Sequence, residues 1–315
     1  MITKEIIKMY DTIIVGGGVA GLGAAVYCGR FELKTLVLAD KIGGTIILTG
    51  DIYNYPGFKK ISGMELADKI KEHAGDYGIE IKEEKVSKIE KHGNFFKVNG
   101  YKTKTIIFAT GTEWRKLNVR GEKEFSGKGV HYCSLCDGVL YKNKIVCVVG
   151  GSDSAAKEAL MLTQWAKKVY IIYRKEKIRA EPINLKRVQE SKKIEVINNT
   201  NVVSIKGDKF VNAVVFDKAY KGSKEFKLDA VFVEIGHIPV SGLAKGIGVK
   251  LNDKNEIIVD KDSKTNIKGF YACGDVVDSK FKQAITGVAE GVIAAYNAYE
   301  YLTKELPVCG CSEDK

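Results

Sequence analysis

The chain has 315 residues, of which 45% are hydrophobic and 28% charged, while only 4 are proline. This composition excludes collagen-like and intrinsically disordered chains, and at roughly 150 residues per domain the length predicts two domains. Lysine and arginine number 50 against 39 acidic residues, a formal net charge of +11. Because basic residues are spread along the chain and mixed with acidic ones, we expect a solvated surface and no nucleic-acid partner.

Neither a membrane span nor a signal peptide is evident. No apolar run approaches the roughly 18 residues of a membrane helix, and the first residues lack a cationic end followed by an apolar stretch. We therefore expect a cytoplasmic protein without a membrane partner. The chain contains 7 cysteines, an odd number in a protein of this size. A structural disulfide framework is not expected, so cysteine pairs indicate redox chemistry or metal binding.

The first chemical motif stands near the amino end. A β-branched apolar strand is predicted over 11–15 and opens into the glycine turn Gly16–Gly21. A helix follows, then a second strand over 35–38 with Asp40 just beyond it. Strand, glycine turn, helix, strand and acid in this order are the βαβ fingerprint of a dinucleotide-binding fold.

Each glycine of this turn has a separate physical task. Gly16 permits the tight turn, Gly18 lets a pyrophosphate approach the backbone and the helix N-terminus, and Gly21 lets the helix pack closely on the strand. The alternative is a glycine-rich turn that binds nothing. The flanking strands and the acid favour the dinucleotide interpretation.

The same order recurs later in the chain. An apolar strand is predicted over 144–149, followed by a glycine-rich turn that begins at Gly150, a helix over 156–166 and a second strand over 169–173. The sequence therefore contains two nucleotide-type modules.

The second module departs from the fingerprint. Ser152 replaces the middle glycine, Ala155 replaces the last one, and the second strand leads into Arg174, Lys175 and Arg179 in place of an acid. These cations suit the 2′-phosphate of NADP and favour it over NAD, whereas Ser152 weakens the signal. A plain cationic loop after a strand is the alternative.

Two further apolar strands, over 104–108 and 269–272, lie on either side of the second module. If both complete the first sheet, the second module is an insertion and the first domain is discontinuous. We expect an α/β protein with two Rossmann-like, three-layer nucleotide-binding domains. The first would span 1–117 and 244–315, and the inserted one 118–243.

A C-x-x-C motif, Cys133 and Cys136, lies between the two glycine turns. This spacing allows a disulfide when the second cysteine begins a helical turn, a position that also lowers a thiolate pKa. Half of a zinc site is an alternative, with Cys309 and Cys311 as the remaining ligands, and a pair of buried thiols is another. Redox chemistry is favoured, and no metal is expected.

With these motifs the sequence resembles a known family, the low-molecular-weight thioredoxin reductases of the two-Rossmann, FAD-dependent pyridine nucleotide-disulfide oxidoreductase group. The resemblance covers nearly the whole chain. A cysteine pair inside the inserted domain is its most specific feature. The motifs that carry it stand in the family's order: Gly16–Gly21, Ala109–Gly111, Cys133–Asp137, Gly150–Ala155, Gly274–Asp275 and Gln283–Ile285.

The resemblance implies FAD in the first domain and a reduced nicotinamide nucleotide, NADPH in preference, in the inserted one. It implies that Asp275 binds the ribityl chain and that Gln283 and Ala284 open a final helix whose dipole stabilises reduced flavin. The residues assigned to FAD are Gly16, Gly18, Gly21, Asp40, Gly44, Thr45, Asn54, Asp275, Gln283 and Ala284. Those assigned to the nucleotide are Gly150, Ser152, Ala155, Arg174, Lys175 and Arg179.

The resemblance also implies catalytic roles. Cys136 would be the flavin-side sulfur, Cys133 the interchange thiol that attacks the substrate disulfide, and Asp137 the acid. An ordinary acid at a helix N-terminus is the alternative for Asp137, and His131 is a weaker candidate for a proton shuttle. The expected partner is a thioredoxin- or glutaredoxin-like protein, and the expected assembly is a homodimer.

Two other functions fit the same fold. A redox-silent nucleotide-binding sensor is one, because fold does not guarantee activity. A reductase that takes electrons from ferredoxin or a deazaflavin is the other, and Ser152 is the residue that favours it. Cys309 and Cys311 form either a mobile relay dithiol or incidental thiols of a tail.

Overall fold

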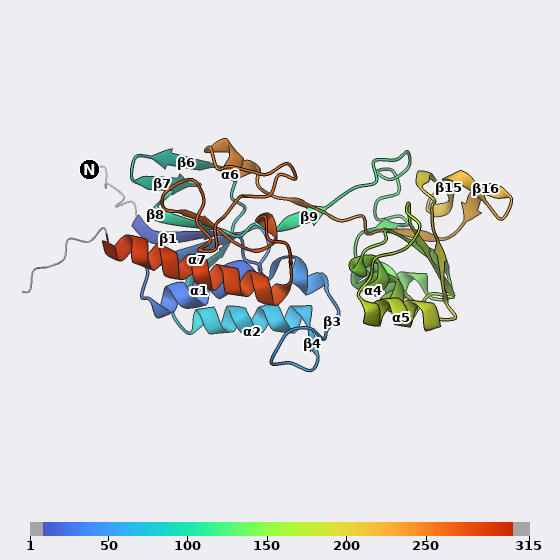
Figure 1. Cartoon of the computed structure of the whole chain (residues 1–315), viewed down its shortest axis with the longest axis horizontal. Coiled ribbons are helices and arrows are strands. Elements are labelled where there is room, and N and C mark those ends of the chain that lie inside the picture. Colours follow the sequence, from blue (N-terminus) through green and yellow to red (C-terminus); the bar gives the residue numbers. More distant parts are fainter. Residues whose placement is uncertain (1–8, 305–315) are drawn as a thin grey trace, which may run out of the picture. The chain divides into compact units, whose positions relative to one another are not determined.

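A computed structural model describes residues 9–304 of the chain. These residues form two compact units, each built on its own sheet (Figure 1). One unit comprises the residues up to Thr112 and from Pro239 onward, and the other is Glu113–Ile238. The predicted insertion of one α/β unit into another is confirmed. Both crossings lie a few residues before the expected boundaries at 117 and 243.

The sheet of the first unit has the strand order β5-β2-β1-β8-β7-β6, with β19 paired to β8. The pairs among β5, β2, β1, β8 and β19 are parallel, whereas β6 and β7 form an antiparallel hairpin that pairs with β8. The two outer strands expected from the sequence therefore do complete the first sheet. The strand bounds are β1 Met9–Val15, β2 Thr35–Ala39, β5 Glu80–Glu83, β6 Ile89–His92, β7 Phe95–Val98, β8 Tyr101–Phe108 and β19 Phe270–Ala272.

Helices cover one face of this sheet. Ile14 of β1 packs among the alanines of α1 (Val19–Arg30) and α7 (Ala284–Lys304), with α2 (Gly63–Gly75) alongside α1 (Figure 1). The two long helices lie close together because small residues face each other. An added Cβ on Gly291 would collide with the backbone carbonyl of Ala20. Ile13 and Val15 point to the opposite face, where they meet the β-hairpin and later segments.

The second unit contains a parallel sheet of order β10-β17-β11-β12-β13. Val146 and Val148 of β11 pack against the helices α4 and α5, while Cys147 and Val149 face an antiparallel sheet, β14-β15-β16. Strands buried on both faces explain the continuous apolar runs of the sequence. The bounds are β10 Val130–His131, β11 Ile145–Val149, α4 Asp153–Leu162, β12 Lys168–Ile172, α5 Pro182–Glu190, β13 Ile194–Ile197, β14 Val202–Gly207, β15 Val211–Tyr220, β16 Ser223–Lys227 and β17 Ala230–Val233.

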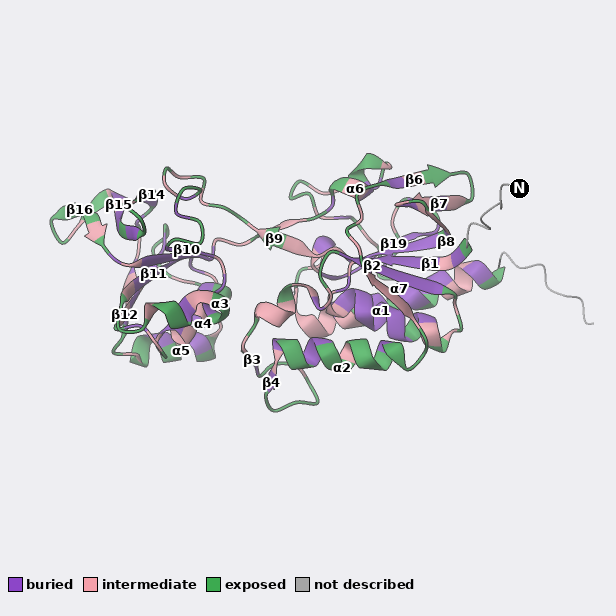
Figure 2. Ribbon diagram, turned by 180° about the vertical axis from the view of Figure 1, so that it is seen from behind, coloured by how far each residue is buried: buried purple, intermediate pink, exposed green. Residues whose placement is uncertain are grey.

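Burial follows the layers. In Figure 2 the parallel strands at the centre of each unit are mostly purple, whereas the outward face of α2 is green. Within residues 9–304 no helix is both long and apolar enough to cross a membrane. The remaining elements are η1 Gly44–Leu48, β3 Asp51–Ile52, β4 Ile61–Ser62, β9 Thr112–Trp114, α3 Ser134–Asp137, η2 Gly138–Tyr141, β18 His237–Pro239, α6 Gly242–Gly246 and η3 Gly274–Val276.

Candidate active site

The first glycine turn links β1 to α1. Gly16 has a φ of +112°, and a side chain there would also collide with the carbonyl oxygen of Ala109. A Cβ on Gly21 would meet the carbonyl of Gly16, so helix and turn are in direct contact. Gly18 differs, because the nearest described atom to an added Cβ would be Gly44 Cα at 3.9 Å. The described protein atoms therefore leave the space beside Gly18 open to a ligand.

A second glycine loop borders this space. The amide of Gly43 donates to the carbonyl of Gly17 at 2.8 Å, and Gly18 and Gly43 form a backbone bridge. Gly44 then begins η1 with a φ of +65°, and Thr45 follows it. The two loops, far apart in the sequence, lie side by side at the N-terminus of α1.

Asn54 and Gln283 are joined directly, although 229 positions separate them: Asn54 Nδ2 donates to Gln283 Oε1 at 2.9 Å. Gln283 immediately precedes α7, and its carbonyl accepts the first helical hydrogen bond, from Gly287, at 2.9 Å. Added Cβ atoms on Gly287 and Gly274 would contact Ala20 of α1. The start of α7 and the start of α1 are therefore neighbours.

Asp275 lies in η3, half-buried, and its carbonyl accepts a hydrogen bond from Lys282 Nζ at 3.0 Å. Glu290 of α7 holds this segment by accepting the amide of Gly274 at 2.7 Å, a support that the sequence did not reveal. Asp40, next to the end of β2, is exposed and pairs with Lys85 at 3.7 Å.

The second glycine turn links β11 to α4. A side chain on Gly150 would collide with the carbonyl of Glu234, and Gly151 lies against the ring of Tyr173. Ser152 is the N-cap residue of α4, yet its side chain caps no backbone amide. The amide of Arg179 donates to the carbonyl of Gly151 at 2.6 Å. The loop after β12 is thereby fastened to the turn, and the buried Ala155 lets α4 pack on the sheet.

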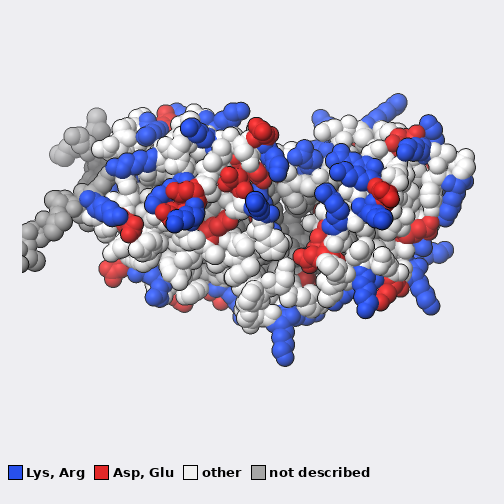
Figure 3. Space-filling model, in the orientation of Figure 1, with Lys and Arg blue, Asp and Glu red and all other residues white. Residues whose placement is uncertain are grey.

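The basic residues at this turn are available to a ligand. Arg174, Lys175 and Arg179 are exposed, and none of them forms an ion pair within residues 9–304. On the face drawn in Figure 3, by contrast, Lys and Arg are interspersed with Asp and Glu over the surface. Unpaired guanidinium groups beside a glycine turn suit a phosphate.

Cys133 and Cys136 form a disulfide, with their Cα atoms 5.4 Å apart. The helical turn α3 starts at Ser134, so Cys133 and not Cys136 stands at its beginning. This corrects the expectation that the second cysteine begins the turn. The amide of Cys136 donates to Cys133 Sγ at 3.1 Å because an N-cap side chain accepts from the third helical residue. In the disulfide form Cys133 is buried and Cys136 exposed.

A carboxyl group from the neighbouring helix supports the cysteine turn. Glu158 of α4 accepts hydrogen bonds from the amide of Ser134, at 2.7 Å, and from its hydroxyl. Burial raises the pKa of Glu158, and burial together with the charge of Glu158 raises the pKa of the nearby Glu234 to about 8. No motif in the sequence connected these acids to the cysteines, since the contact depends on how α4 packs against α3.

Asp137, the last residue of α3, lies 3.0 Å from a histidine: its Oδ2 meets His131 Nδ1. The other ring nitrogen of His131, Nε2, lies 2.7 Å from the hydroxyl of Tyr141. His131 is 4% exposed, and burial lowers its pKa against the opposing attraction of Asp137. The structure therefore brings together three polar side chains of which the sequence singled out only two.

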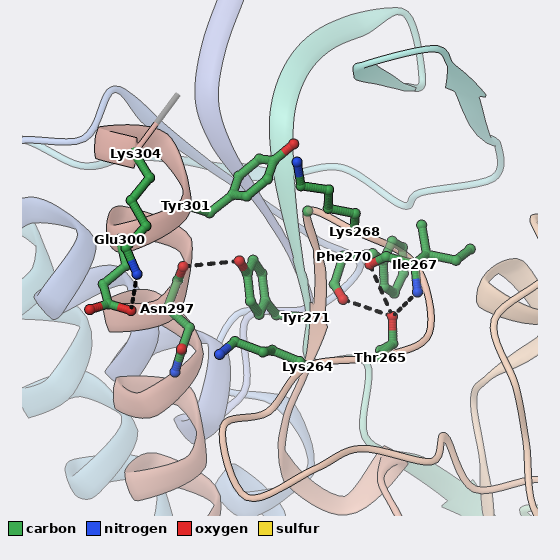
Figure 4. A pocket seen from close by; sticks show the side chains of 11 residues that line it. Lys264, Thr265, Ile267, Lys268, Phe270, Tyr271, Asn297, Glu300, Tyr301 and Lys304 are labelled. Carbon is green, nitrogen blue, oxygen red and sulfur yellow. Dashed lines mark hydrogen bonds and ion pairs between the residues drawn. The ribbon is translucent and has the colours of Figure 1, made fainter. Parts of the chain in front are cut away.

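Other features of the surface lie away from these residues. The cavity of about 240 Å³ in Figure 4 is lined by β19 and the end of α7, including Lys264, Tyr271 and Tyr301, and by none of the predicted site residues. In the described part of the chain no cluster of three or more His, Cys, Asp or Glu is arranged to hold a metal ion. Cys309 and Cys311 lie outside the described residues.

Comparisons with known proteins agree with this arrangement. A family model described as pyridine nucleotide-disulphide oxidoreductase matches residues 10–291. The thioredoxin reductase of Bacillus subtilis is 39% identical over 306 residues, which cover 94% of this chain and 95% of that protein.

Solved structures extend the similarity to three dimensions. Lactococcus lactis thioredoxin reductase matches with a TM-score of 0.90 at 38% identity, covering 94% of this chain and 99% of the other. A ferredoxin-flavin thioredoxin reductase from Clostridium acetobutylicum matches with a TM-score of 0.51 at 34% identity, over 94% and 99% of the two chains. The chain belongs to the pyridine nucleotide-disulphide oxidoreductase family.

Proposed function

We propose that this chain is an FAD-dependent thioredoxin-disulfide reductase, which passes electrons from a reduced nicotinamide nucleotide through the Cys133–Cys136 disulfide to thioredoxin. The observation that carries the proposal is the disulfide itself, set at a helical turn and followed directly by Asp137. Two dinucleotide-type glycine turns in the same chain supply places for an electron carrier and an electron donor.

The first unit fits FAD. Gly18 leaves open space at the N-terminus of α1, and the loop of Gly43 and Gly44 borders that space, so a pyrophosphate can approach the backbone there. When bound, FAD supplies a two-electron carrier between nucleotide and disulfide. Asn54 and Gln283, joined to each other at the start of α7, would orient it, together with Asp275. Thr45 lies in η1, Ala284 is the first residue of α7, and Asp40 follows β2.

The cysteines perform thiol–disulfide exchange. After reduction the amide of Cys136 is placed to donate to a thiolate on Cys133, and such a donor favours the charged, nucleophilic form. We assign Cys133 to the attack on the substrate disulfide and Cys136 to the re-formation of the internal one. Asp137 holds the proton that the leaving thiolate takes up.

NADPH is the donor that we favour. Arg174, Lys175 and Arg179 present three unpaired cations beside the turn of Gly150 and Ser152, as a 2′-phosphate requires. A donor such as ferredoxin or a deazaflavin is the second candidate, because Ser152 occupies the place of a glycine and a ferredoxin-flavin thioredoxin reductase resembles this chain. A redox-silent sensor would have no use for the disulfide.

Thioredoxin is the partner that the relatives' names indicate, and a glutaredoxin-like protein is an alternative substrate. We further propose a cytoplasmic homodimer. The dimer is supported by an exposed apolar strip of Tyr27, Ile293 and Tyr296 on α1 and α7, beside a shallow cavity of about 480 Å³. Sedimentation of the full chain tests the dimer, and Tyr296→Glu should produce monomers.

The test of the proposed function compares three purified proteins. The wild type should be yellow, carry about one FAD per chain, and reduce thioredoxin with NADPH. Cys133→Ser should leave Cys136 as a thiolate beside oxidised flavin, giving a long-wavelength absorption band that Cys136→Ser lacks. Turnover should vanish in both variants.

Cys147→Ser is the matched control, because that thiol is buried in the second unit and unpaired, so its removal should leave the spectrum and the turnover intact. Equal spectra for Cys133→Ser and Cys136→Ser would contradict the assigned roles. A well-folded wild type that takes up no FAD would refute the proposed function. Truncation after Pro307 separately tests whether Cys309 and Cys311 relay electrons: unchanged turnover dismisses the relay.

A further inference from the structure

His131 occupies a fixed position between two polar side chains and one aromatic ring. Its imidazole stacks on Phe232 of β17 with ring centroids 5.3 Å apart, and the residue is 4% exposed. Nδ1 lies 3.0 Å from Asp137 Oδ2, and Nε2 lies 2.7 Å from the Tyr141 hydroxyl. Both nitrogens therefore have a partner, and the ring cannot flip without losing both contacts.

The partners determine where the hydrogens lie. Burial raises the pKa of Tyr141 to about 12, so its hydroxyl keeps its proton at neutral pH. An ionised Asp137 only accepts, so Nδ1 carries the hydrogen and donates to it. In the neutral imidazole Nε2 then accepts from Tyr141. Uptake of one proton at Nε2 requires only that the Tyr141 hydroxyl turn and accept instead.

The surroundings of the imidazole contain few other charges. The groups that face it are Asp137 from α3, Tyr141 from η2 and the apolar Phe232 from β17. Asp229, just before β17, acts on Tyr141 through its charge and is itself paired with Lys144 at 3.3 Å. Any proton bound at this place is therefore held by Asp137 and His131 together.

We propose that His131 is a positioning residue for Asp137: its imidazole holds the carboxylate and shares with it the proton that passes to the thiolate released from the substrate disulfide. The inference rests on the proposed function, which assigns Asp137 the role of acid. An isolated carboxylate gives up its proton well below neutral pH, and the imidazole adds a second site, Nε2, at which the pair can take up a proton.

The exchange balances with this pair. The Cys133 thiolate attacks one sulfur of the substrate disulfide, a mixed disulfide forms, and the second substrate sulfur leaves as a thiolate that takes the proton from the pair. Cys136 then gives its proton to the pair and attacks Cys133 Sγ. The internal disulfide re-forms, and the first substrate sulfur leaves as a thiolate that is protonated in turn, from the pair or from water. Two electrons pass from the enzyme dithiol to the substrate disulfide.

The first experiment observes the pair without turnover. The full-length holoprotein is labelled with ¹⁵N-histidine, its 4 histidines are resolved by long-range ¹H–¹⁵N correlation, and His131→Asn assigns the signal. We expect His131 in the tautomer protonated at Nδ1, and a titration midpoint that falls by about half a unit or more in Asp137→Asn, because the attraction of the carboxylate is lost. The Nε2-protonated tautomer, or an unchanged midpoint in Asp137→Asn, would overturn the inference.

The second experiment measures kcat/KM for thioredoxin between pH 6 and 9. His131→Phe keeps a ring on Phe232 but removes both nitrogens, and His131→Asn keeps a donor toward Asp137 without proton uptake. Both should lose about tenfold at pH 6 and much less at pH 8, because burial lowers the pKa of His131 and the imidazole holds the additional proton only toward acid pH; His131→Asn should be the less impaired of the two. His92→Asn, exposed on β6, is the matched control and should follow the wild type.

The outcomes separate the two proposals. A uniform loss at every pH would assign His131 a merely structural role, and an unaltered profile would remove it from the mechanism. If His131→Phe does not fold, His131→Asn and the NMR titration still decide. If the wild type binds FAD but reduces no disulfide, the proposed function fails, and the titration of Asp137→Asn still shows whether the pair exists.

Discussion

The two glycine turns of this chain are built alike and surrounded differently. In each, the amide of the first glycine, Gly16 or Gly150, donates to a carbonyl of the second strand, at 2.8 and 3.0 Å. In each, a side chain on that glycine would collide with the carbonyl of the residue after the third strand, Ala109 or Glu234. The backbone of the second turn repeats that of the first.

The side chains around the turns differ in charge. The first turn is bordered by Ala109 and by the loop of Gly43 and Gly44, so a ligand there would meet backbone atoms and open space. The second is bordered by the backbone carbonyl of Glu234, a residue whose side chain is buried, and by the exposed Arg174 and Lys175. The turn therefore decides where a pyrophosphate can approach, whereas the residues beside it decide which nucleotide is held.

The largest effect is expected from Gly18→Val in the first turn. An added Cβ there would meet only Gly44 Cα, at the ordinary contact distance of 3.9 Å, so the substitution should leave the fold intact, but valine fills the space that a pyrophosphate needs. We expect the protein to purify without yellow colour and to bind FAD at least about 100-fold more weakly, roughly 2.7 kcal/mol. Fluorescence titration with FAD measures the loss. Gly75→Val, at the exposed end of α2, is the control, and equal FAD affinity in both variants would contradict the site.

Arg174→Ala tests the charge difference. Removal of one guanidinium from the 2′-phosphate should cost about 1.5–3 kcal/mol, so the NADPH concentration that half-saturates flavin reduction should rise about tenfold or more while that for NADH hardly changes. Anaerobic stopped-flow mixing measures both. Lys177→Ala, in the same exposed loop, is the matched control. Should neither nucleotide reduce the flavin while dithionite does, the donor is of another class.

Glu234→Gln tests the buried acid beside the second turn. The pKa of this carboxyl is raised to about 8 in the folded chain, against about 4.3 when unfolded, so the folded state keeps a proton that the unfolded state has lost. Stability is therefore fully present below about pH 4.3 and falls as pH rises toward 8, by up to about 1.4 kcal/mol per pH unit. Thermal unfolding of the wild type between pH 5 and 8 should fall more steeply than that of Glu234→Gln. The exposed Glu225→Gln should run parallel to the wild type, and a parallel curve for Glu234→Gln would deny the carboxyl this role.

The smallest effect is expected from Ser152→Gly, which makes the second turn more like the first. If the serine side chain crowds the pyrophosphate, its removal should strengthen NADPH binding by about threefold, less than 1 kcal/mol. Ser154→Gly, exposed on the first turn of α4, controls for the added backbone freedom. Weaker binding in Ser152→Gly alone would instead mean that the hydroxyl donates to a phosphate oxygen.

Much of the fold could be predicted from local patterns. The predicted strands over 11–15 and 35–38 correspond to β1 and β2, and those over 144–149 and 169–173 to β11 and β12, each within one or two residues. These elements have apolar, β-branched residues bounded by glycine turns, so neighbours in sequence decide their form. The antiparallel sheet β14-β15-β16 was not predicted, because apolar and polar residues alternate only weakly along its strands, which are buried on one side only.

The site was predictable only as a set of separate motifs. The cysteine spacing indicated a disulfide, and the structure contains it, but the start of α3 was placed at the wrong cysteine because a helix of four residues has too little pattern to locate its first residue. The contact of Asn54 with Gln283 joins residues that the family resemblance named individually and that no local rule pairs.

By itself, then, the sequence determined the two βαβ modules, the insertion of one in the other and the redox cysteine pair, because glycine conformations and apolar periodicity act over a few residues. Only the tertiary structure decided that His131 meets Asp137, that Glu158 supports Ser134 and that Glu234 is buried beside Gly150. Such contacts depend on which helices and strands pack together. A titratable group becomes buried, and its pKa changes, only once that packing has formed.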